Sequence, residues 1–173
     1  FMRTCVKLLP LMAILAVAAW AQKVQYDFDR SADFQAYRTY SWMPQATTVD
    51  QLTDQNIRSA IERELAEKGL MRVDQNPDLL VGYQLTVREQ QEIQTWGDGG
   101  WGWRSPGWAT TTVTEVPVGS LVVDLYDPAR KQLVFRTVGT KTLDTNASPE
   151  KREKNLDKAL DKMFKHYPPE RNN

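Results

Sequence analysis

Three aspartates near the start of the chain carry the carboxylates that acid–base chemistry or calcium binding would need. Asp27 and Asp29 lie close together, and Asp33 follows them. Glycosidases use paired carboxylates, and Ca²⁺ takes about 6–8 oxygen ligands. The alternation around Asp27 and Asp29 predicts instead that both point to the solvent-facing side of a strand. We therefore expect neither a catalytic pair nor a calcium site here.

The single histidine and the single cysteine do not supply a second set of reactive groups. His166 falls in the last turn of a predicted helix and has no second ligand at metal-binding spacing. Cys5 precedes a short apolar run that we expect to be removed from the mature protein. The glycines of residues 97–107 lack the Gly-Lys-Ser pair of a phosphate-binding loop. These patterns predict a protein that is not an enzyme and needs no cofactor or metal.

Tryptophans are concentrated in the glycine-rich stretch 96–108, which we expect to form a long loop between two strands. Indole rings on such a loop can stack on sugars, lie at a membrane interface or anchor a protein partner. The alternative is that they fold back over the sheet as a hydrophobic lid. We expect them to be exposed. Four of the six tryptophans, the candidate binding residues, lie here: Trp96, Trp101, Trp103 and Trp108.

Residues 1–21 have the pattern of a secretory signal peptide. Arg3 and Lys7 precede an apolar run that is too short to span a bilayer, and Ala19 and Ala21 suit cleavage after Ala21. Because Cys5 precedes the apolar run, it cannot accept a lipid after cleavage. The mature chain, expected to contain no transmembrane segment, should be periplasmic or secreted, with association to the outer membrane left open.

Residues 22–173 are expected to form a single domain with an unremarkable charge. The whole chain has 22 Lys and Arg against 22 Asp and Glu, and the leader holds two of the basic residues, which leaves a net charge of −2. This balance argues against a nucleic-acid partner. A domain of this length can bury a core without disulfides.

The periodicity of apolar residues predicts both strands and helices. Alternation indicates early strands at 24–29 and 37–42, and a longer strand at 78–90 with one solvent-facing side. A pair of strands, 121–127 and 133–143, reads as a hairpin with a short polar turn.

Two stretches show helical spacing instead. Residues 52–68 carry Ile57, Ile61 and Leu65 on one face and are followed by Gly69. Either Asp50 or Thr53 could cap the start of this helix. A second helix should begin after the capping residue Ser148 and end at residues 168–169, which are both proline. Two helices with one apolar stripe each predict an α+β two-layer sandwich, a mainly antiparallel sheet with both helices packed on one face.

An ordered series of short motifs resembles a bacterial cell-envelope family, domain of unknown function 4136. Its landmarks here are Tyr26-Asp27-Phe28-Asp29, Ala32-Asp33-Phe34, Tyr37-Arg38-Thr39-Tyr40-Ser41-Trp42, Lys68-Gly69-Leu70, Pro77-Asp78-Leu79-Leu80-Val81, Gly119-Ser120-Leu121-Val122-Val123-Asp124-Leu125, Lys151-Arg152-Glu153-Lys154 and Tyr167-Pro168-Pro169. The resemblance implies a secreted or lipid-anchored envelope protein without established catalytic residues or cofactor. This chain differs from the lipoproteins of that family because no cysteine follows its apolar run.

Two functions are compatible with these observations. The first is a non-catalytic exported envelope protein that acts through contacts with an envelope protein or supports the envelope. The alternative is a module that binds cell-wall or other glycans through Trp96, Trp101, Trp103 and Trp108.

Overall fold

A computed structural model describes residues 23–44, 49–97 and 109–170, with side chains described over these ranges except 94–97 and 109–110. The elements occur in the order β1 (Lys23–Phe28), β2 (Thr39–Trp42), α1 (Gln51–Glu67), β3 (Met71–Arg72), β4 (Leu79–Gly97), β5 (Ala109–Asp127), β6 (Gln132–Thr142) and α2 (Pro149–Phe164). Neither helix in these ranges is long and apolar enough to cross a bilayer.

The strands form one six-stranded sheet in the order β1-β6-β5-β4-β2-β3. The pairs β1–β6, β6–β5 and β5–β4 are antiparallel, whereas β2 runs parallel to both β4 and β3. Parallel neighbours need a crossover connection, and α1 supplies it between β2 and β4. The sheet is therefore mixed, with the antiparallel pairs that we predicted at its centre.

Both helices begin at a capping side chain, which is Ser148 for α2, as predicted, and Asp50, one of the two candidates, for α1. The Asp50 carboxylate accepts a hydrogen bond of 3.0 Å from the amide of Thr53 at the start of α1. The Ser148 hydroxyl accepts one of 3.3 Å from the amide of Lys151 at the start of α2. Each bond satisfies an amide that has no partner within the helix. Gly69 follows α1 with a φ of 82°, a conformation that glycine adopts without strain.

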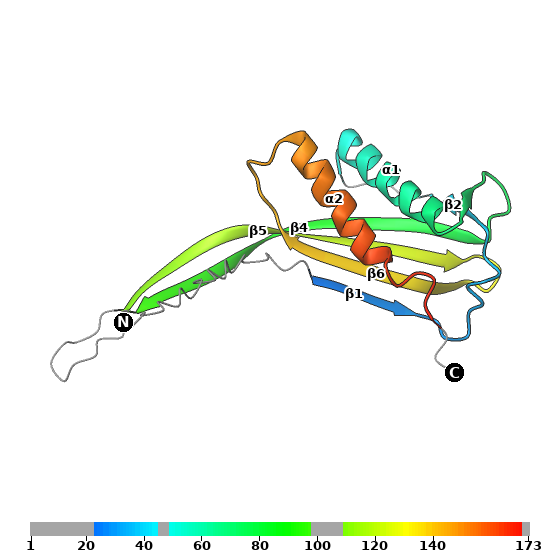
Figure 1. The fold of residues 1–173 in the computed structure, drawn as a ribbon, viewed down its shortest axis with the longest axis horizontal. Coiled ribbons are helices and arrows are strands. Elements are labelled where there is room, and N and C mark those ends of the chain that lie inside the picture. Colours follow the sequence, from blue (N-terminus) through cyan, green and yellow to red (C-terminus); the bar gives the residue numbers. More distant parts are fainter. Residues whose placement is uncertain (1–22, 45–48, 98–108, 171–173) are drawn as a thin grey trace, which may run out of the picture.

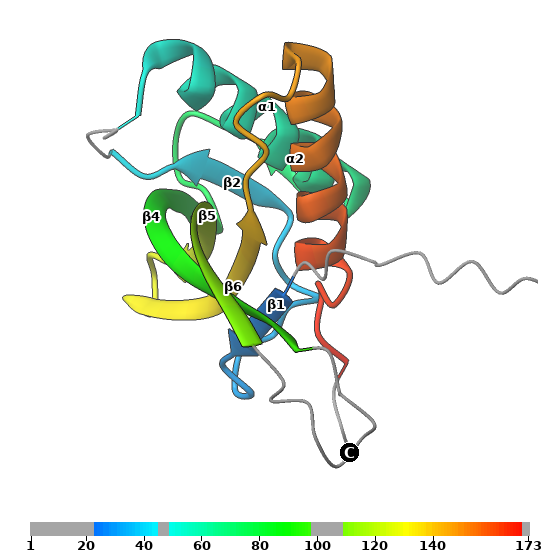
Figure 2. The same ribbon diagram turned by 90° about the vertical axis from the view of Figure 1, so that its left-hand side faces the viewer.

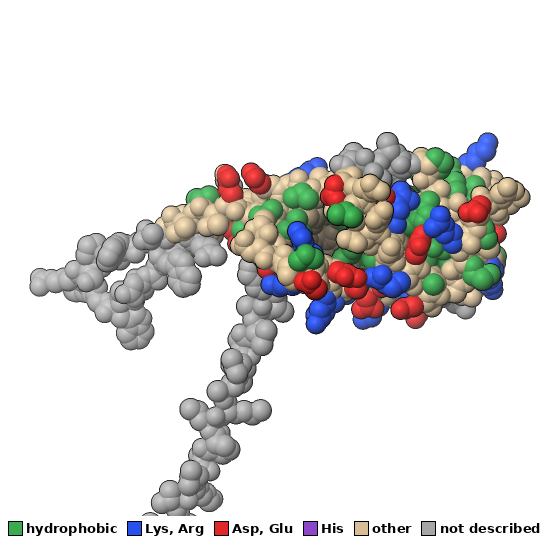
Figure 3. Space-filling view, turned by 90° about the horizontal axis from the view of Figure 1, so that it is seen from above, with side chains coloured by type: hydrophobic (Ala, Val, Ile, Leu, Met, Phe, Trp, Pro, Cys, Tyr) green, Lys and Arg blue, Asp and Glu red, His purple; other side chains and the backbone are tan. Residues whose placement is uncertain are grey.

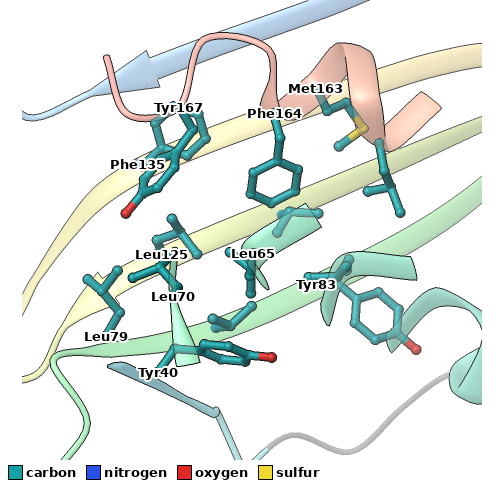
Figure 4. Close-up of a cluster of buried hydrophobic side chains, with 14 of the residues drawn as sticks. Tyr40, Leu65, Leu70, Leu79, Tyr83, Leu125, Phe135, Met163, Phe164 and Tyr167 are labelled. Atoms are coloured by element: carbon teal, nitrogen blue, oxygen red, sulfur yellow. The ribbon is translucent and has the colours of Figure 1, made fainter. Parts of the chain in front are cut away.

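The two helices pack on the same face of the sheet, as the apolar stripes predicted (Figures 1 and 2). The core lies between these two layers, where Leu65 of α1 and Phe164 of α2 point toward Leu125 and Phe135 of the sheet (Figure 4). Alternate residues of the central strands supply its floor, and Leu79, Val81, Val123 and Leu125 are all fully buried. The predicted α+β sandwich is confirmed.

The helices cover only part of the sheet. Strands β4 and β5 are each 19 residues long, and their far halves extend beyond both helices as a two-stranded projection (Figure 1). We had expected strands of 78–90 and 121–127 here, so the sequence interpretation located the inner halves of these strands and missed the outer ones.

Candidate functional site: the β4–β5 arm

The outer halves of β4 and β5 form what we call the arm, Val87–Gly97 paired with Ala109–Gly119. The register is regular along its length, from Val87 opposite Gly119 to Gly97 opposite Ala109. Threonine and valine are abundant in residues 110–118, and such β-branched side chains favour an extended backbone. That composition is the signal that could have revealed the outer half of β5.

Outside the arm, neighbouring strands flank β4 and β5 on both sides. Strand β2 pairs with β4 only through Val81, and the amide of Met43 donates to the Val81 carbonyl at 2.8 Å. Strand β6 reaches β5 only as far as Val118, which lies opposite Thr142. Within the arm, therefore, the outer edge of β4 and most of the outer edge of β5 have no neighbouring strand among the described residues.

One face of the arm carries exposed apolar side chains. Ile93 and Val113 lie directly opposite each other and are 67% and 54% exposed. Side chains alternate between the two faces of a strand, and both Val87 and Ile93 are odd-numbered positions of β4. Val87 therefore lies on the same face, and it is 54% exposed. The same face is buried under the helices farther along the strands, at Val81 and Val123. Glu89 and Gln91 lie between Val87 and Ile93 on this face, so the apolar side chains continue from the core onto the arm only at some positions, and there without a cover.

The other face of the arm is polar and carries charges. Arg88, Gln90 and Glu92 of β4 all point to this face, and all three are exposed. Neither Arg88 nor Glu92 forms an ion pair with another described residue. The arm therefore offers partner groups of three kinds: free backbone edges, apolar side chains and unpaired charges.

The structure changes the place of the predicted tryptophan loop. Trp96 belongs to β4, where its backbone lies opposite Thr110, so the prediction that the loop begins at residue 96 is wrong. Its side chain is outside the described side chains. Trp101, Trp103 and Trp108 lie outside the described residues altogether. The segment that joins the two strands is 98–108, and the binding role of these tryptophans stays a prediction.

The N-terminal aspartates are not gathered into a site. Asp27 is exposed at the end of β1 and accepts a bond of 2.9 Å from the amide of Phe28. Asp29 lies after the strand and not on its solvent-facing side as we predicted; its carboxylate is 3.0 Å from the Arg130 guanidinium. Hydrogen bonds from Ser31 lower the pKa of Asp29. Asp33 accepts a bond of 3.3 Å from the amide of Gln35.

His166 lies just beyond the end of α2 and not within its last turn. Its ring stacks on Tyr26 of β1, with the ring centres 4.6 Å apart. This contact joins the helix end to the edge strand. Over the described ranges, no group of three or more His, Cys, Asp and Glu side chains lies close enough to bind a metal ion.

A polar cluster that we did not predict lies where β4 enters the arm. Tyr83, the last largely buried residue of β4, donates a hydrogen bond to Asp54 of α1, and Asp54 pairs with Arg58 at 3.0 Å. The Arg58 guanidinium also lies 4.5 Å from the centre of the Trp42 ring. Burial and the bond to Asp54 raise the pKa of Tyr83. The cluster therefore ties β4 to α1 shortly before the arm begins.

A second cluster fixes the opposite end of β5. The Tyr37 hydroxyl donates to Asp127 at 2.8 Å, and the other carboxylate oxygen of Asp127 accepts from the amides of Ala129 and Arg130. Burial and the bond to Asp127 raise the pKa of Tyr37 to about 12. These bonds shape the turn between β5 and β6, and neither cluster leaves a reactive group free.

Comparison with solved structures gives similarity in fold at low sequence identity. A PDZ domain protein from Parabacteroides distasonis superposes with a TM-score of 0.57 and 15% identity over 85% of this chain; the match spans only 35% of that protein. Two structures of the PelC dodecamer from Paraburkholderia phytofirmans superpose with TM-scores of 0.51 and 0.50 and identities of 14% and 12%. They cover 83% of this chain and 95% of PelC.

Sequence comparison gives a single clear result. No curated protein matches this chain. The family described as domain of unknown function (DUF4136) matches residues 24–169, which include every strand and both helices of the sandwich except the first residue of β1. The chain therefore belongs to the DUF4136 family.

Proposed function

We propose that this chain is a non-catalytic protein of the bacterial cell envelope that acts through protein contacts, with the arm as its contact element. One observation carries the proposal: the arm extends beyond both helices with uncovered apolar side chains and unpaired edges. A two-stranded ribbon on its own is marginally stable in water, so an arm of this length gains stability from a partner. Exposed strand edges are ready templates for pairing with another chain.

The charged side chains of the body support a structural role. Arg136 holds both carboxylate oxygens of Asp124 at 2.6 and 2.7 Å across β5 and β6. The Asp29–Arg130 pair likewise joins the residue after β1 to the turn between β5 and β6, whereas Asp54 and Arg58 pair within α1. Side chains engaged in this way stabilise the sandwich and are not available for acid–base chemistry.

Two further observations support export and assembly. Residues 1–21 carry the signal-peptide pattern, and PelC, whose fold is similar, is described as a dodecamer. An exported protein cleaved after Ala21 would begin at Gln22. Mass analysis of the protein isolated from an envelope or periplasmic fraction tests this point, and a chain that retains residues 2–21 would contradict it.

Site-specific photo-crosslinking tests the contact role. A photoreactive amino acid at Gln91, on the arm, should capture a protein in envelope fractions, whereas the same group at Lys158, on the exposed side of α2, should not. The captured band should disappear when Ile93 and Val113 are both replaced by aspartate. Equal capture from Gln91 and Lys158, or none from Gln91, would overturn the proposal.

The glycan-binding alternative depends on Trp96, Trp101, Trp103 and Trp108. Titration of tryptophan fluorescence with peptidoglycan fragments separates it from the protein-contact proposal. A saturable change that is lost on replacing Trp101 and Trp103 would support the glycan-binding module. No change at millimolar fragment, together with capture from Gln91, would favour protein contacts.

A further inference from the structure

We infer that two copies of this chain pair through the free edge of β4, antiparallel and related by a two-fold axis at Gln90. The inference rests on the proposed function, because it gives the arm a particular partner, a second copy of the same chain. It would join the two arms into a four-stranded ribbon in the order β5-β4-β4-β5. Backbone direction, edge protection and side-chain complementarity each lead to this arrangement.

The backbone directions identify which residues of β4 can bond outward. The carbonyl of Val81 points away from β5, since it accepts from Met43 on the β2 side. The carbonyl of Pro117 points away from β4, since it accepts from Leu143 at 2.7 Å, and Pro117 lies opposite Glu89. In an antiparallel pair, two residues that lie opposite each other either bond to each other or both direct their backbone N–H and C=O groups away. The backbone groups of Glu89 therefore also point outward. The odd-numbered residues of β4 therefore present their backbone groups at the free edge.

The two edges of the arm differ in their protection. Pro117 lies on β5 with its nitrogen on the outer edge, where it has no N–H to donate, and its carbonyl already accepts from Leu143, so this edge lacks a free donor and a free acceptor here. The edge of β4 has no proline or glycine from Tyr83 to Trp96. Pairing is therefore expected at β4 and not at β5.

The side chains of β4 complement themselves when the strand is turned around Gln90. Each odd-numbered residue of β4 then lies opposite an odd-numbered residue of the second copy. The outward backbone N–H and C=O groups of the two strands can therefore bond to each other. Val87 comes to lie opposite Ile93 of the second copy, and Arg88 opposite Glu92 of the second copy. The two-fold axis makes each of these pairs twice. Apolar pairs and opposite charges across neighbouring strands both stabilise a sheet.

Neighbouring registers lack this complementarity. Shifting the axis to Glu89 places that carboxylate opposite its own copy, and shifting it to Gln91 places Glu89 opposite Ile93. The register centred on Gln90 is the one that pairs the charge of Arg88 with an acid. It also covers the exposed side chains Val87 and Ile93, which are 54% and 67% exposed in the single chain.

The shape of the molecule leaves room for this pairing. The arm projects from one end of the body, and both helices lie away from it (Figures 1 and 2). Seen from above, it is narrow and stands clear of the described body (Figure 3). Antiparallel pairing places the second body at the far end of the first arm, so the two described bodies are separated along the ribbon.

Charge reversal tests the pairing between molecules. In the Arg88→Glu variant, two carboxylates face each other at both symmetric positions of the dimer. In the Glu92→Arg variant, two guanidinium groups face each other at both positions. Sedimentation of the full chain should show a dimer for the wild type and dissociation constants raised at least about tenfold for each variant. Mixing the two variants in equal amounts should restore the dimer, because every pair then joins opposite charges. Arg152→Glu on α2 and Glu115→Arg on β5 are matched controls that should leave the dimer unchanged.

A cysteine at the axis tests the register. With Cys5 replaced by serine, Gln90→Cys faces its own copy in a pair whose Cα atoms are about 4.5 Å apart, a distance that a disulfide can span. We expect it to form a covalent dimer on mild oxidation, whereas Gln84→Cys should not. Equal crosslinking at both positions would overturn the register, even if the protein is dimeric.

The outcomes separate this inference from the proposed function. A wild type that stays monomeric at all concentrations, or a mixture of charge variants that does not restore the dimer, overturns the pairing of two copies. If Gln91 still captures another envelope protein in either case, the contact role of the arm stands. A dimer that is weakened by each charge variant and restored by their mixture supports both the pairing of two copies and the contact role of the arm.

Discussion

Gly139 of β6 lies directly against Met163 of α2, so close that a Cβ atom on Gly139 would be 2.6 Å from the Met163 sulfur. Met163 is fully buried, so its side chain cannot turn away into solvent. The contact brings α2 down onto the sheet at β6. It also explains why the smallest residue occupies this position of a central strand.

Gly139→Ala should therefore destabilise the protein by about 1–3 kcal/mol, the usual cost of overpacking a core. Urea denaturation followed by circular dichroism measures it. Gly119→Ala is the matched control: a Cβ there would meet Leu143 at 2.9 Å, but Leu143 is 40% exposed and its side chain can turn away. Equal losses from the two variants would show that burial of the neighbour does not decide the cost.

Leu160→Ala should cost about 2–5 kcal/mol, because Leu160 is fully buried on the face of α2 that covers the sheet. The midpoint of urea denaturation should fall accordingly. Lys158→Ala, an exposed change on the same helix, should leave the midpoint almost unchanged. A wild-type midpoint for Leu160→Ala would mean that α2 contributes little to the core.

Asp78 should make stability depend on pH in the acid range. Hydrogen bonds from the amides of Arg38 and Thr39 and from the Thr39 hydroxyl hold its pKa below the ordinary value of 3.8. A depressed pKa stabilises the folded state above pH 3.8, and this contribution is lost as the pH falls through the lowered pKa. Asp78→Asn should thus be less stable than wild type at pH 7, and the gap should narrow steadily below about pH 4. A gap of constant size down to pH 2 would contradict this.

Replacing Ile93 and Val113 with threonine should weaken dimerisation but leave the stability of the monomer almost unchanged. Both side chains are exposed in the single chain, and threonine keeps the β-branched shape that suits a strand. The free energy of unfolding of the monomer, measured at low protein concentration, should change by less than about 0.5 kcal/mol per site. Dimerisation in sedimentation should weaken. A large loss of monomer stability would mean that these side chains are packed against the body.

The sequence predicted the sandwich well because its signals are local. Ser148 caps α2 as predicted, and Asp50, one of two candidates, caps α1. The alternation from Leu79 to Leu85 marks the buried half of β4. The two-residue strand β3 was missed because it is too short for any periodicity. The parallel placement of β2 beside β4 depends on α1 and not on the residues of β2.

The arm was harder to predict for a different physical reason. Alternation of apolar and polar side chains arises where one face is buried, and most side chains of the arm are exposed on both faces. Gln90, Gln91 and Glu92 therefore look like the end of a strand. The cluster of Tyr83, Asp54 and Arg58 joins residues from separate elements, so only the folded chain brings it together.

The position of β1 has a consequence for how the chain folds. Among the described strands it pairs with β6 alone, and the Thr137 hydroxyl of β6 donates to the carbonyl of Gln25 across a separation of 112 residues. As the first of the described strands in chain order, β1 must therefore stay unpaired until nearly the whole domain has been made. Such non-local pairing slows folding. The chain is therefore kinetically vulnerable until β6 has formed, and a holding chaperone that covers β1 would act at this step.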